Sequence, residues 1–250
     1  VRSSAASDVY KRQVYIGSFE EFGYFIRKTD GQMQYYSLSA GVKDKISSND
    51  EIWHIVRLGE KIYFQSFTGW YSYDGKAVSY MDRKSGFRPL YFYTCHDKVY
   101  AQMINGGFYE FDGQRFHLLL ERTAVGNDNV VAILPYGNSG MVLLTVDSGL
   151  FVYEHGTVSA LRTDIDAQLR WAKGNRAVMV GDSILAIGTI LDGIYGVDKK
   201  GHLLWHLNRD NQLNNNSVMG LFGDRENNLW AALDDGISFV HTNTSITLLT

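Results

Sequence analysis

A glycine that follows one apolar run and precedes another recurs six times along this chain of 250 residues. Neighbouring glycines of the set are 38 to 46 residues apart. This spacing is close to the length of one four-stranded propeller blade, which is about 40 to 50 residues. The repeat therefore predicts a β-propeller. The six glycines are Gly23, Gly69, Gly107, Gly149, Gly193 and Gly236.

Residues 51–82 show one repeat in full. They contain four runs, EIWHIVRL, KIYFQSF, WYSYD and AVSYMD, separated by the pairs GE, TG and GK. The runs are rich in β-branched and aromatic residues, and each pair is a turn signal, so the pattern is typical of four short antiparallel strands. Such a sheet cannot bury both of its faces alone, but sheets packed radially against one another can. The predicted fold is an all-β propeller of four-stranded antiparallel blades.

The same reading gives the blade boundaries. We expect inner strands at Ile52–Leu58, Leu90–His96, Val130–Tyr136, Arg176–Gly181 and Ser217–Gly223. No first strand is expected in the first blade, because residues 1–13, VRSSAASDVYKRQ, resemble a translated sequencing-adapter junction and are set aside as non-native or disordered. Both ends of the chain look cut, so we expect a part of a larger propeller sensor. The expected repeats are 14–38, 51–82, 90–120, 130–162, 175–208 and 217–250.

Two local patterns give further expectations. Asp-Gly pairs begin at Asp30, Asp74 and Asp112, between the expected third and fourth strands, and indicate type I′ hairpins. Trp230 and Tyr63 each lie six residues before the glycine of their repeat. A large ring at this position is expected to pack between neighbouring sheets, which makes Trp230 a structural residue.

Composition and motifs argue against several classes of function. The chain has 24 Lys and Arg against 27 Asp and Glu, a net charge of −3, which argues against general nucleic-acid binding. No apolar run reaches the length of about 18 residues that spans a membrane. The single Cys95 excludes an internal disulfide and reads as a buried small hydrophobe. The seven histidines are spread over five repeats, and no metal, phosphate-loop or nucleophile motif occurs. We predict no metal site, no cofactor and no catalytic residue.

Polar side chains at one end of the repeats are the candidates for a ligand site. The turn between the second and third strands and the segment leading into the next first strand share one face of a propeller. Acids in these turns could form a hydrolase pair, which needs a separation of about 5 to 9.5 Å, although Asp is also a common turn former. Asn49, Asn129 and Asn216 each stand 20 residues before a glycine and either fix the turn or line the channel mouth.

Arg170 and Trp171 lie on a similar connecting segment. The tryptophan could stack on a sugar and the arginine could meet a carboxylate or sulfate, or the two are a surface arginine beside a half-buried ring. The predicted ligand-binding set is Glu20, Glu21, Asn49, Asn105, Asp147, Arg170, Trp171, Asp192 and Asn216.

The stretch LNNNSVMGLFGDRENNLWAALDDGISFV, Leu213–Val240, resembles the repeat of two-component regulator propellers. Asn227 departs from the usual glycine, Ala231 and Ala232 replace the usual small pair, and the other repeats are more divergent. YIGSFEEFGYF, YFQSFTGWYSYDG and GTILDGIY are similar to the subgroup that carries a triple-tyrosine module. The residues that match the repeat are Leu213, Asn216, Val218, Asp224, Asn228, Leu229, Trp230 and Gly236.

This resemblance implies a non-enzymatic, ligand-sensing fragment of a bacterial membrane-anchored regulator. In such proteins the propellers lie in the periplasm, and a membrane helix leads to a histidine kinase or to a DNA-binding domain of the helix-turn-helix type. The implied ligand is a small molecule or an oligosaccharide. The segment itself would touch neither nucleic acid nor, except through segments absent here, the membrane. The resemblance also leaves open that the full-length protein is a homodimer.

Two other functions stay open from the sequence. The first is a propeller glycoside hydrolase or lyase, although no clear S-x-D-x-G-x-x-W string of the sialidase type occurs. The second is a cytoplasmic scaffold of the WD40 kind, although the Gly-His and Trp-Asp pairs that punctuate each repeat of that kind do not recur along this chain.

Overall fold

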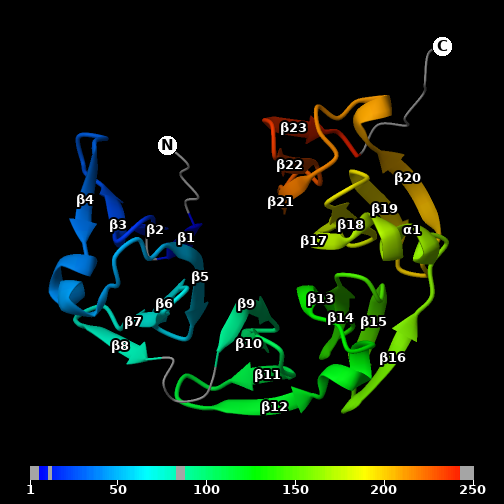
Figure 1. The fold of residues 1–250 in the computed structure, drawn as a ribbon. Helices are drawn as coiled ribbons and strands as arrows, with labels where there is room; N and C mark the ends of the chain where they lie inside the picture. The colour runs from blue at the N-terminus through cyan, green and yellow to red at the C-terminus, as the bar shows by residue number, and fades with distance from the viewer. Residues whose placement is uncertain (1–5, 11–12, 83–87, 243–250) are drawn as a thin grey trace. The chain divides into compact units, whose positions relative to one another are not determined.

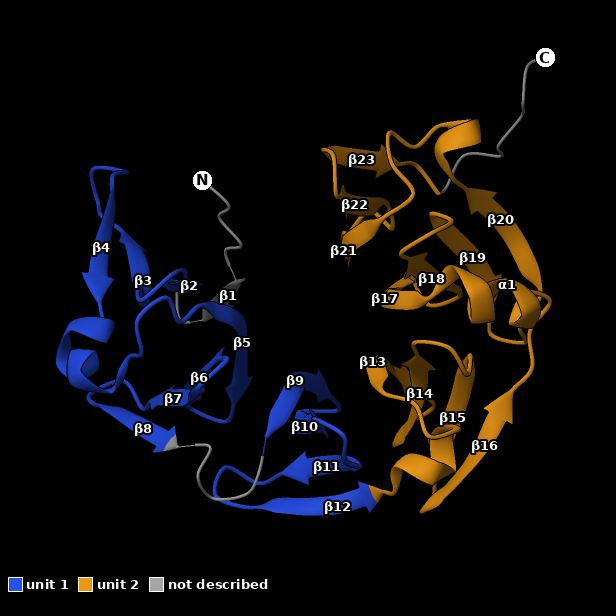
Figure 2. Ribbon diagram, viewed as in Figure 1, with its two compact units in different colours: residues 1–119 blue, residues 120–250 orange. Residues whose placement is uncertain are grey.

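The computed structural model describes residues 6–10, 13–82 and 88–242. The chain forms two compact units, residues 1–119 and residues 120–250 (Figure 2). In the part of the chain that the structure describes, each unit contains three small antiparallel sheets (Figure 1). The predicted all-β propeller fold is confirmed.

The first unit contains sheets one, two and three. Sheet one is formed by β1 (Ala6–Tyr10), β2 (Gln13–Gly17), β3 (Phe22–Arg27) and β4 (Met33–Ser37). Sheet two is formed by β5 (Ile52–Leu58), β6 (Lys61–Ser66), β7 (Gly69–Tyr73) and β8 (Val78–Asp82). Sheet three is formed by β9 (Pro89–Cys95), β10 (Lys98–Met103), β11 (Phe108–Phe111) and β12 (Phe116–Leu120). A 3-10 segment, Ser39–Lys45, connects β4 to the chain before β5.

The second unit contains sheets four, five and six. Sheet four is formed by β13 (Val130–Tyr136), β14 (Gly140–Thr145), β15 (Leu150–Glu154) and β16 (Thr157–Leu161). Sheet five is formed by β17 (Gly174–Val180), β18 (Ile184–Thr189), β19 (Ile194–Asp198) and β20 (Leu203–Leu207). Sheet six is formed by β21 (Val218–Gly223), β22 (Leu229–Leu233) and β23 (Ile237–Val240). The helix α1 (Asp166–Ala172) and 3-10 segments at Arg122–Val125 and Arg209–Asn211 lie between strands.

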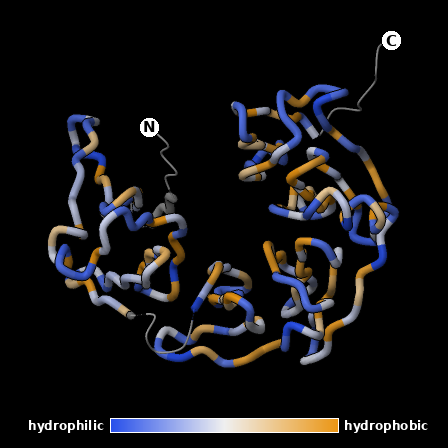
Figure 3. Tube along the Cα trace, in the orientation of Figure 1, coloured by the Kyte–Doolittle hydropathy of each residue, from blue (hydrophilic) through white to orange (hydrophobic). Residues whose placement is uncertain are grey.

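Apolar side chains between successive sheets hold each unit together. The first strands lie side by side, with β5 next to β9 in the first unit and β17 next to β21 in the second. Figure 3 shows apolar stretches along strands such as β13. Between sheets one and two the buried core is largely aromatic, including Tyr15, Phe22, Phe64 and Tyr71. Between sheets five and six it is aliphatic, and includes Ala186, Ile194, Val218 and Leu229. Burial of these apolar faces stabilises the packing of sheet against sheet that the repeat predicts.

The predicted inner strands agree with the structure. Two of them, β5 and β13, begin and end at the predicted residues, whereas β9, β17 and β21 are displaced by one or two residues. None of these five segments is helical. The expected fourth strand of the last blade falls in residues 243–250, outside the described residues.

The expectation for the first blade is corrected by the structure. Residues Ala6–Tyr10, which the sequence reading set aside, form β1 and pair with β2 from Ala6 opposite Gly17 to Tyr10 opposite Gln13. The strand forms because the edge of β2 presents unpaired N–H and C=O groups that an extended preceding segment can satisfy. Sheet one therefore has four strands. The non-native origin of residues 1–13 stays a prediction.

The Asp-Gly turns also differ from the expected type. Gly31, Gly75 and Gly113 have positive φ, of 85°, 92° and 97°, but the preceding aspartates do not. A type I′ turn would need positive φ at both central residues. Instead each aspartate bonds to the backbone: the Asp74 carboxylate accepts from the Lys76 and Ala77 amides at 2.9 and 2.8 Å. The aspartate side chain thus fixes the turn.

Candidate ligand-binding site

A buried hydroxyl closes several of the second-to-third turns, the turns between the second and third strands of a sheet. Thr189 Oγ1 donates to the Gly193 carbonyl at 3.0 Å and accepts from the Asp192 amide at 3.0 Å. Thr145 makes the same pair of bonds with Gly149 and Ser148. At Gly193, φ is +70° and an added Cβ would lie 2.1 Å from the Leu207 carbonyl oxygen, so this turn requires glycine.

These turns lie against the lead-in segments, the residues just before each first strand. In the first unit the Glu20 amide donates to the Asp50 carbonyl at 2.8 Å. In the second unit the Gly193 amide donates to the Asn216 carbonyl at 2.9 Å. Within each unit, a turn and the next lead-in segment therefore share one side, as the sequence reading expected.

Two buried aspartates, which the sequence reading missed, fix the turns. The Asp128 carboxylate accepts from the Asp147 and Ser148 amides at 2.6 and 2.8 Å. Asp50, which is 5% exposed, accepts from the Phe67 amide at 3.1 Å and from the Thr68 hydroxyl. They stand beside Asn49 and Asn129 and perform the turn-fixing role that those asparagines were expected to perform. An aspartate two residues before an apolar run was the available signal.

A β-bulge near the start of the first strand recurs in sheets two to six. In sheet two the register shifts between Ile52 and His54, so Trp53 is the bulged residue. The equivalent shifts leave Asn175 bulged in sheet five and Met219 in sheet six. Bulges redirect side chains and are common beside functional sites. This recurring irregularity lies next to the lead-in segments.

The structure brings Glu20 and Asn49 together in the first unit. The Asn49 amide donates to Glu20 Oε1 at 2.6 Å, and both residues are exposed with positive φ. Asn105 is exposed at the tip of the turn between β10 and β11, with φ of +54°. These three side chains are accessible to a ligand.

Glu21 has a different environment. Its carboxylate accepts hydrogen bonds from the hydroxyls of Tyr35, Ser37 and Ser39 at 2.5, 2.7 and 2.6 Å. Burial acts to raise the pKa of Glu21, but these three bonds and the nearby Lys43 outweigh it and lower the pKa below its ordinary value of 4.5. The carboxylate is therefore ionised and engaged, and it ties the residue just before β3 to β4 and to Ser39, which follows β4.

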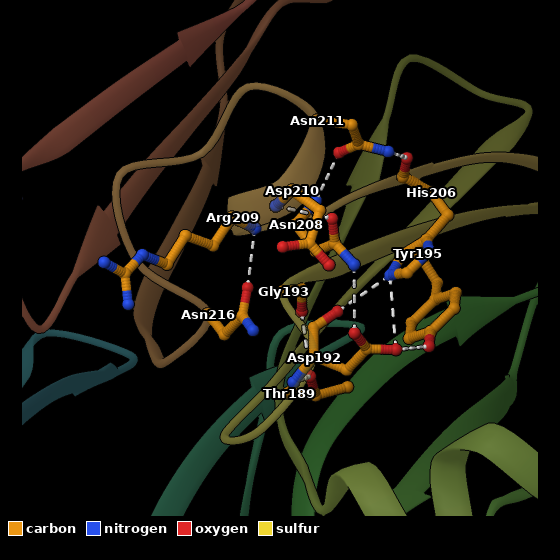
Figure 4. Close-up of polar contacts among 10 residues, drawn as sticks. All are labelled: Thr189, Asp192, Gly193, Tyr195, His206, Asn208, Arg209, Asp210, Asn211 and Asn216. Carbon is orange, nitrogen blue, oxygen red and sulfur yellow. Dashed lines mark hydrogen bonds and ion pairs between the residues drawn. The ribbon is translucent and has the colours of Figure 1, made fainter.

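Asp192 is the centre of a polar network in the second unit (Figure 4). Its carboxylate accepts from the Tyr195 hydroxyl and, at 3.1 Å, from Asn208 Nδ2. Asn208 also accepts from the Asp210 amide and caps the short 3-10 segment, whose Arg209 amide donates to Asn216 Oδ1 at 2.7 Å. The network therefore links two predicted site residues, Asp192 and Asn216.

Tyr195 and His206 pack face to face in this network, with ring centroids 4.1 Å apart. His206 Nε2 donates to the Asp192 carbonyl at 2.8 Å and lies 3.4 Å from the carboxylate. Burial, and then the Asp192 carboxylate, raise the pKa of Tyr195, so its hydroxyl remains a donor. Asp192 thus has its oxygens occupied by protein groups, an arrangement that suits support rather than proton transfer.

Arg170 and Trp171 lie on α1 rather than on an irregular linker. Leu169 and Ala172 of this helix are buried, whereas Arg170 is exposed and Trp171 is 52% exposed. The Leu191 amide donates to the Ala172 carbonyl at 3.0 Å, which places the exposed Leu191 beside the helix. Next to it, Lys173 Nζ lies 2.6 Å from Asp147 Oδ1. Trp171 is therefore an accessible indole ring, with Arg170 and Lys173 close to it along the chain.

The predicted set thus falls into two groups. Glu20, Glu21, Asn49 and Asn105 belong to the first unit, and the other five belong to the second. Among the residues that the structure describes, no group of three His, Cys, Asp or Glu could hold a metal ion. Across the same residues, no helix has the length and apolar character needed to cross a membrane.

Comparisons with known proteins show the fold. No protein-family model and no curated protein sequence matches the chain. Two crystal structures of the extracellular domain of BT4673 from B. thetaiotaomicron, described as a putative one component system and a putative hybrid two component system, match with TM-scores of 0.70 and 0.71 at 16% and 17% identity. Each match covers 96% of this chain and 33% of the BT4673 chain, so the chain spans a third of that length.

Structures described in other terms also match. The WD40 β-propeller domain of Doa1 matches with a TM-score of 0.66 at 8% identity, over 96% of this chain and 78% of that one. BamB from Moraxella catarrhalis matches with a TM-score of 0.60 at 12% identity, over 94% and 81%. At such identities the likeness is one of fold alone.

Proposed function

We propose that this chain is a ligand-sensing propeller segment of a bacterial membrane-anchored regulator, located in the periplasm, and that it binds an anionic or neutral oligosaccharide without changing it. The resemblance of Leu213–Val240 to the regulator repeat and the structural likeness to an extracellular sensor domain support the proposal. The nature of the output domain lies outside this segment.

The observation that carries the proposal is the contrast between fixed and accessible side chains on the turn side of the sheets. Glu21 and Asp192 are held by hydrogen bonds from their own unit, whereas Trp171, Arg170 and Asn49 are exposed. An exposed ring stacks on a sugar, a guanidinium meets a carboxylate or sulfate, and an amide bonds to hydroxyls. Within each unit these exposed groups suit glycan binding, and Glu21 and Asp192 are engaged by their own unit rather than arranged as an acid and a base.

The test is calorimetry of the chain against a panel of neutral, uronic-acid and sulfated oligosaccharides, with chromatography of every binder after incubation. Trp171→Ala should weaken binding of the glycan that the panel identifies. Leu204→Ala is the matched control, because Leu204 is 50% exposed on the outer strand β20. Absence of binding across the panel would refute the proposal, and cleaved products would favour a hydrolase or lyase.

A further inference from the structure

Phe67 combines exposure with a fixed position. It lies in the turn between β6 and β7, and its side chain is 49% exposed. The turn is held by Asp50, which accepts from the Phe67 amide, and by Ser66 Oγ, which accepts from the Thr68 and Gly69 amides at 3.3 and 3.2 Å. A buried carboxylate and a buried hydroxyl thus hold the backbone under an exposed ring. Such fixing lowers the entropy that a binding surface loses when it meets a ligand.

A second aromatic ring packs against the ring of Phe67. Trp53, the bulged residue of β5, stacks on Phe67 with centroids 4.2 Å apart and planes at 25°. Trp53 also contacts Tyr91 of β9, at 5.7 Å and 45°. Among the bulged residues Leu90, Val131, Asn175 and Met219 of the later sheets, none is aromatic. Sheet two therefore carries an aromatic residue, Trp53, at the position where the other described bulges carry aliphatic, thioether or amide side chains.

Asp50, which holds the turn of Phe67, also contacts the turn of sheet one that carries polar residues. The Asp50 carbonyl accepts from the Glu20 amide, so Asp50 joins the turn of sheet one to the turn of sheet two. Glu20 and Asn49 are exposed there, and so is the ring of Phe19, at 46%. These residues thus offer carboxylate and amide acceptors beside apolar ring faces.

We propose that Phe67, backed by Trp53, is a stacking platform for one pyranose ring of a neutral oligosaccharide, with Glu20 and Asn49 accepting hydrogen bonds from its hydroxyls. A pyranose has an apolar C–H face and a rim of hydroxyl donors, which matches an exposed ring bordered by acceptors. A uronate ring would bring a carboxylate toward Glu20, and like charges repel. This inference rests on the proposed function and specifies the ligand class at this place.

The experiment is titration of the 250-residue chain with neutral gluco-, manno-, galacto- and xylo-oligosaccharides and with uronate-containing ones, by calorimetry and by tryptophan fluorescence. We expect a neutral oligosaccharide to bind and to change the tryptophan fluorescence emission, to which Trp53 contributes. Phe67→Ala should weaken that binding by about tenfold or more, the factor that corresponds to loss of about 1.4 kcal/mol. Phe67→Tyr, which keeps the ring, should bind within about threefold of the unchanged chain.

Leu118→Ala is the matched control, since Leu118 is 48% exposed on the outer strand β12 of the same unit. It should leave binding unchanged, and thermal melts should show all three variants folded. Neutral-glycan binding that Phe67→Ala leaves within twofold would overturn the platform while the sensing function stands. If only uronate-containing oligosaccharides bound, the proposal of a neutral ligand would be wrong. Failure of every glycan to bind would reject the sensing proposal and this inference with it.

Discussion

Tyr63 and Trp230 occupy the same position in the second strand of their sheets, yet Tyr63 is 2% exposed and Trp230 is 43% exposed. Tyr63 lies opposite Val56, and Trp230 lies opposite Phe222, each three residues after the bulge of the first strand. The Tyr63 ring meets Phe111 of sheet three edge-on at 5.3 Å. Trp230 instead packs on Phe239 of its own sheet at 4.5 Å and donates to Asp224. Among the described residues of its unit, Trp230 therefore packs within its own sheet, whereas the sequence led us to expect packing between sheets.

The stability consequences of these two positions differ. Tyr63→Ala should lower the free energy of unfolding by about 3 to 5 kcal/mol, because it leaves a cavity between sheets two and three. Trp230→Ala should lower it by less, about 1 to 2 kcal/mol, because 43% of Trp230 already faces solvent. Urea unfolding of the two variants measures both values. Equal losses would show that the Trp230 face is covered in solution.

Glu21 should make the stability of the chain depend on pH. Its pKa is lower in the folded state, so the carboxylate contributes stability above its ordinary value of 4.5, and this contribution is lost as the pH falls through the folded pKa. Glu21→Gln, which cannot ionise, should unfold at lower urea concentration than the unchanged chain at pH 7. The difference between the two should shrink below pH 4. A difference that is constant with pH would contradict an ionised Glu21.

Loss of the Asp192 carboxylate should leave its partners unsatisfied. Asp192→Ala removes the acceptor of the buried Tyr195 hydroxyl and of Asn208 Nδ2, which should cost about 1 to 3 kcal/mol. Asp192→Ala combined with Tyr195→Phe should recover part of this loss, because the phenylalanine has no hydroxyl to satisfy. Thermal and urea unfolding of the single and double variants test this. Additive losses would show that the bond contributes nothing.

Asp128 should control the local stability of the turn between β14 and β15. Asp128→Ala removes the side-chain acceptor of the Asp147 amide and one of the two acceptors of the Ser148 amide, so these amides should exchange with deuterium faster than in the unchanged chain. The amides of the turn between β18 and β19, where Thr189 closes the loop, serve as the internal reference. Unchanged exchange at 147 and 148 would contradict the assigned role.

Much of the fold could be predicted from the sequence because the relevant interactions are local. Alternating apolar residues define strands, and the turn glycines set the repeat, so β5 and β13 were placed to the residue. The position of β1 was missed because residues 1–13 were set aside for their origin. Nothing in their local pattern forbids a strand that pairs with a free edge.

The candidate site depended on tertiary structure. The three hydroxyls on Glu21 come from residues 14 to 18 positions away, and Asp50 meets Phe67 across 17 positions, so no short window of sequence reveals these pairs. Exposure likewise depends on the neighbouring sheet. The sequence by itself determined the repeat, most of the strands and the positions of the turns, since these follow from backbone preference and periodicity. The tertiary structure decided which acids are engaged, which rings are accessible and which faces are covered, because burial and hydrogen-bond satisfaction depend on residues that only folding brings together.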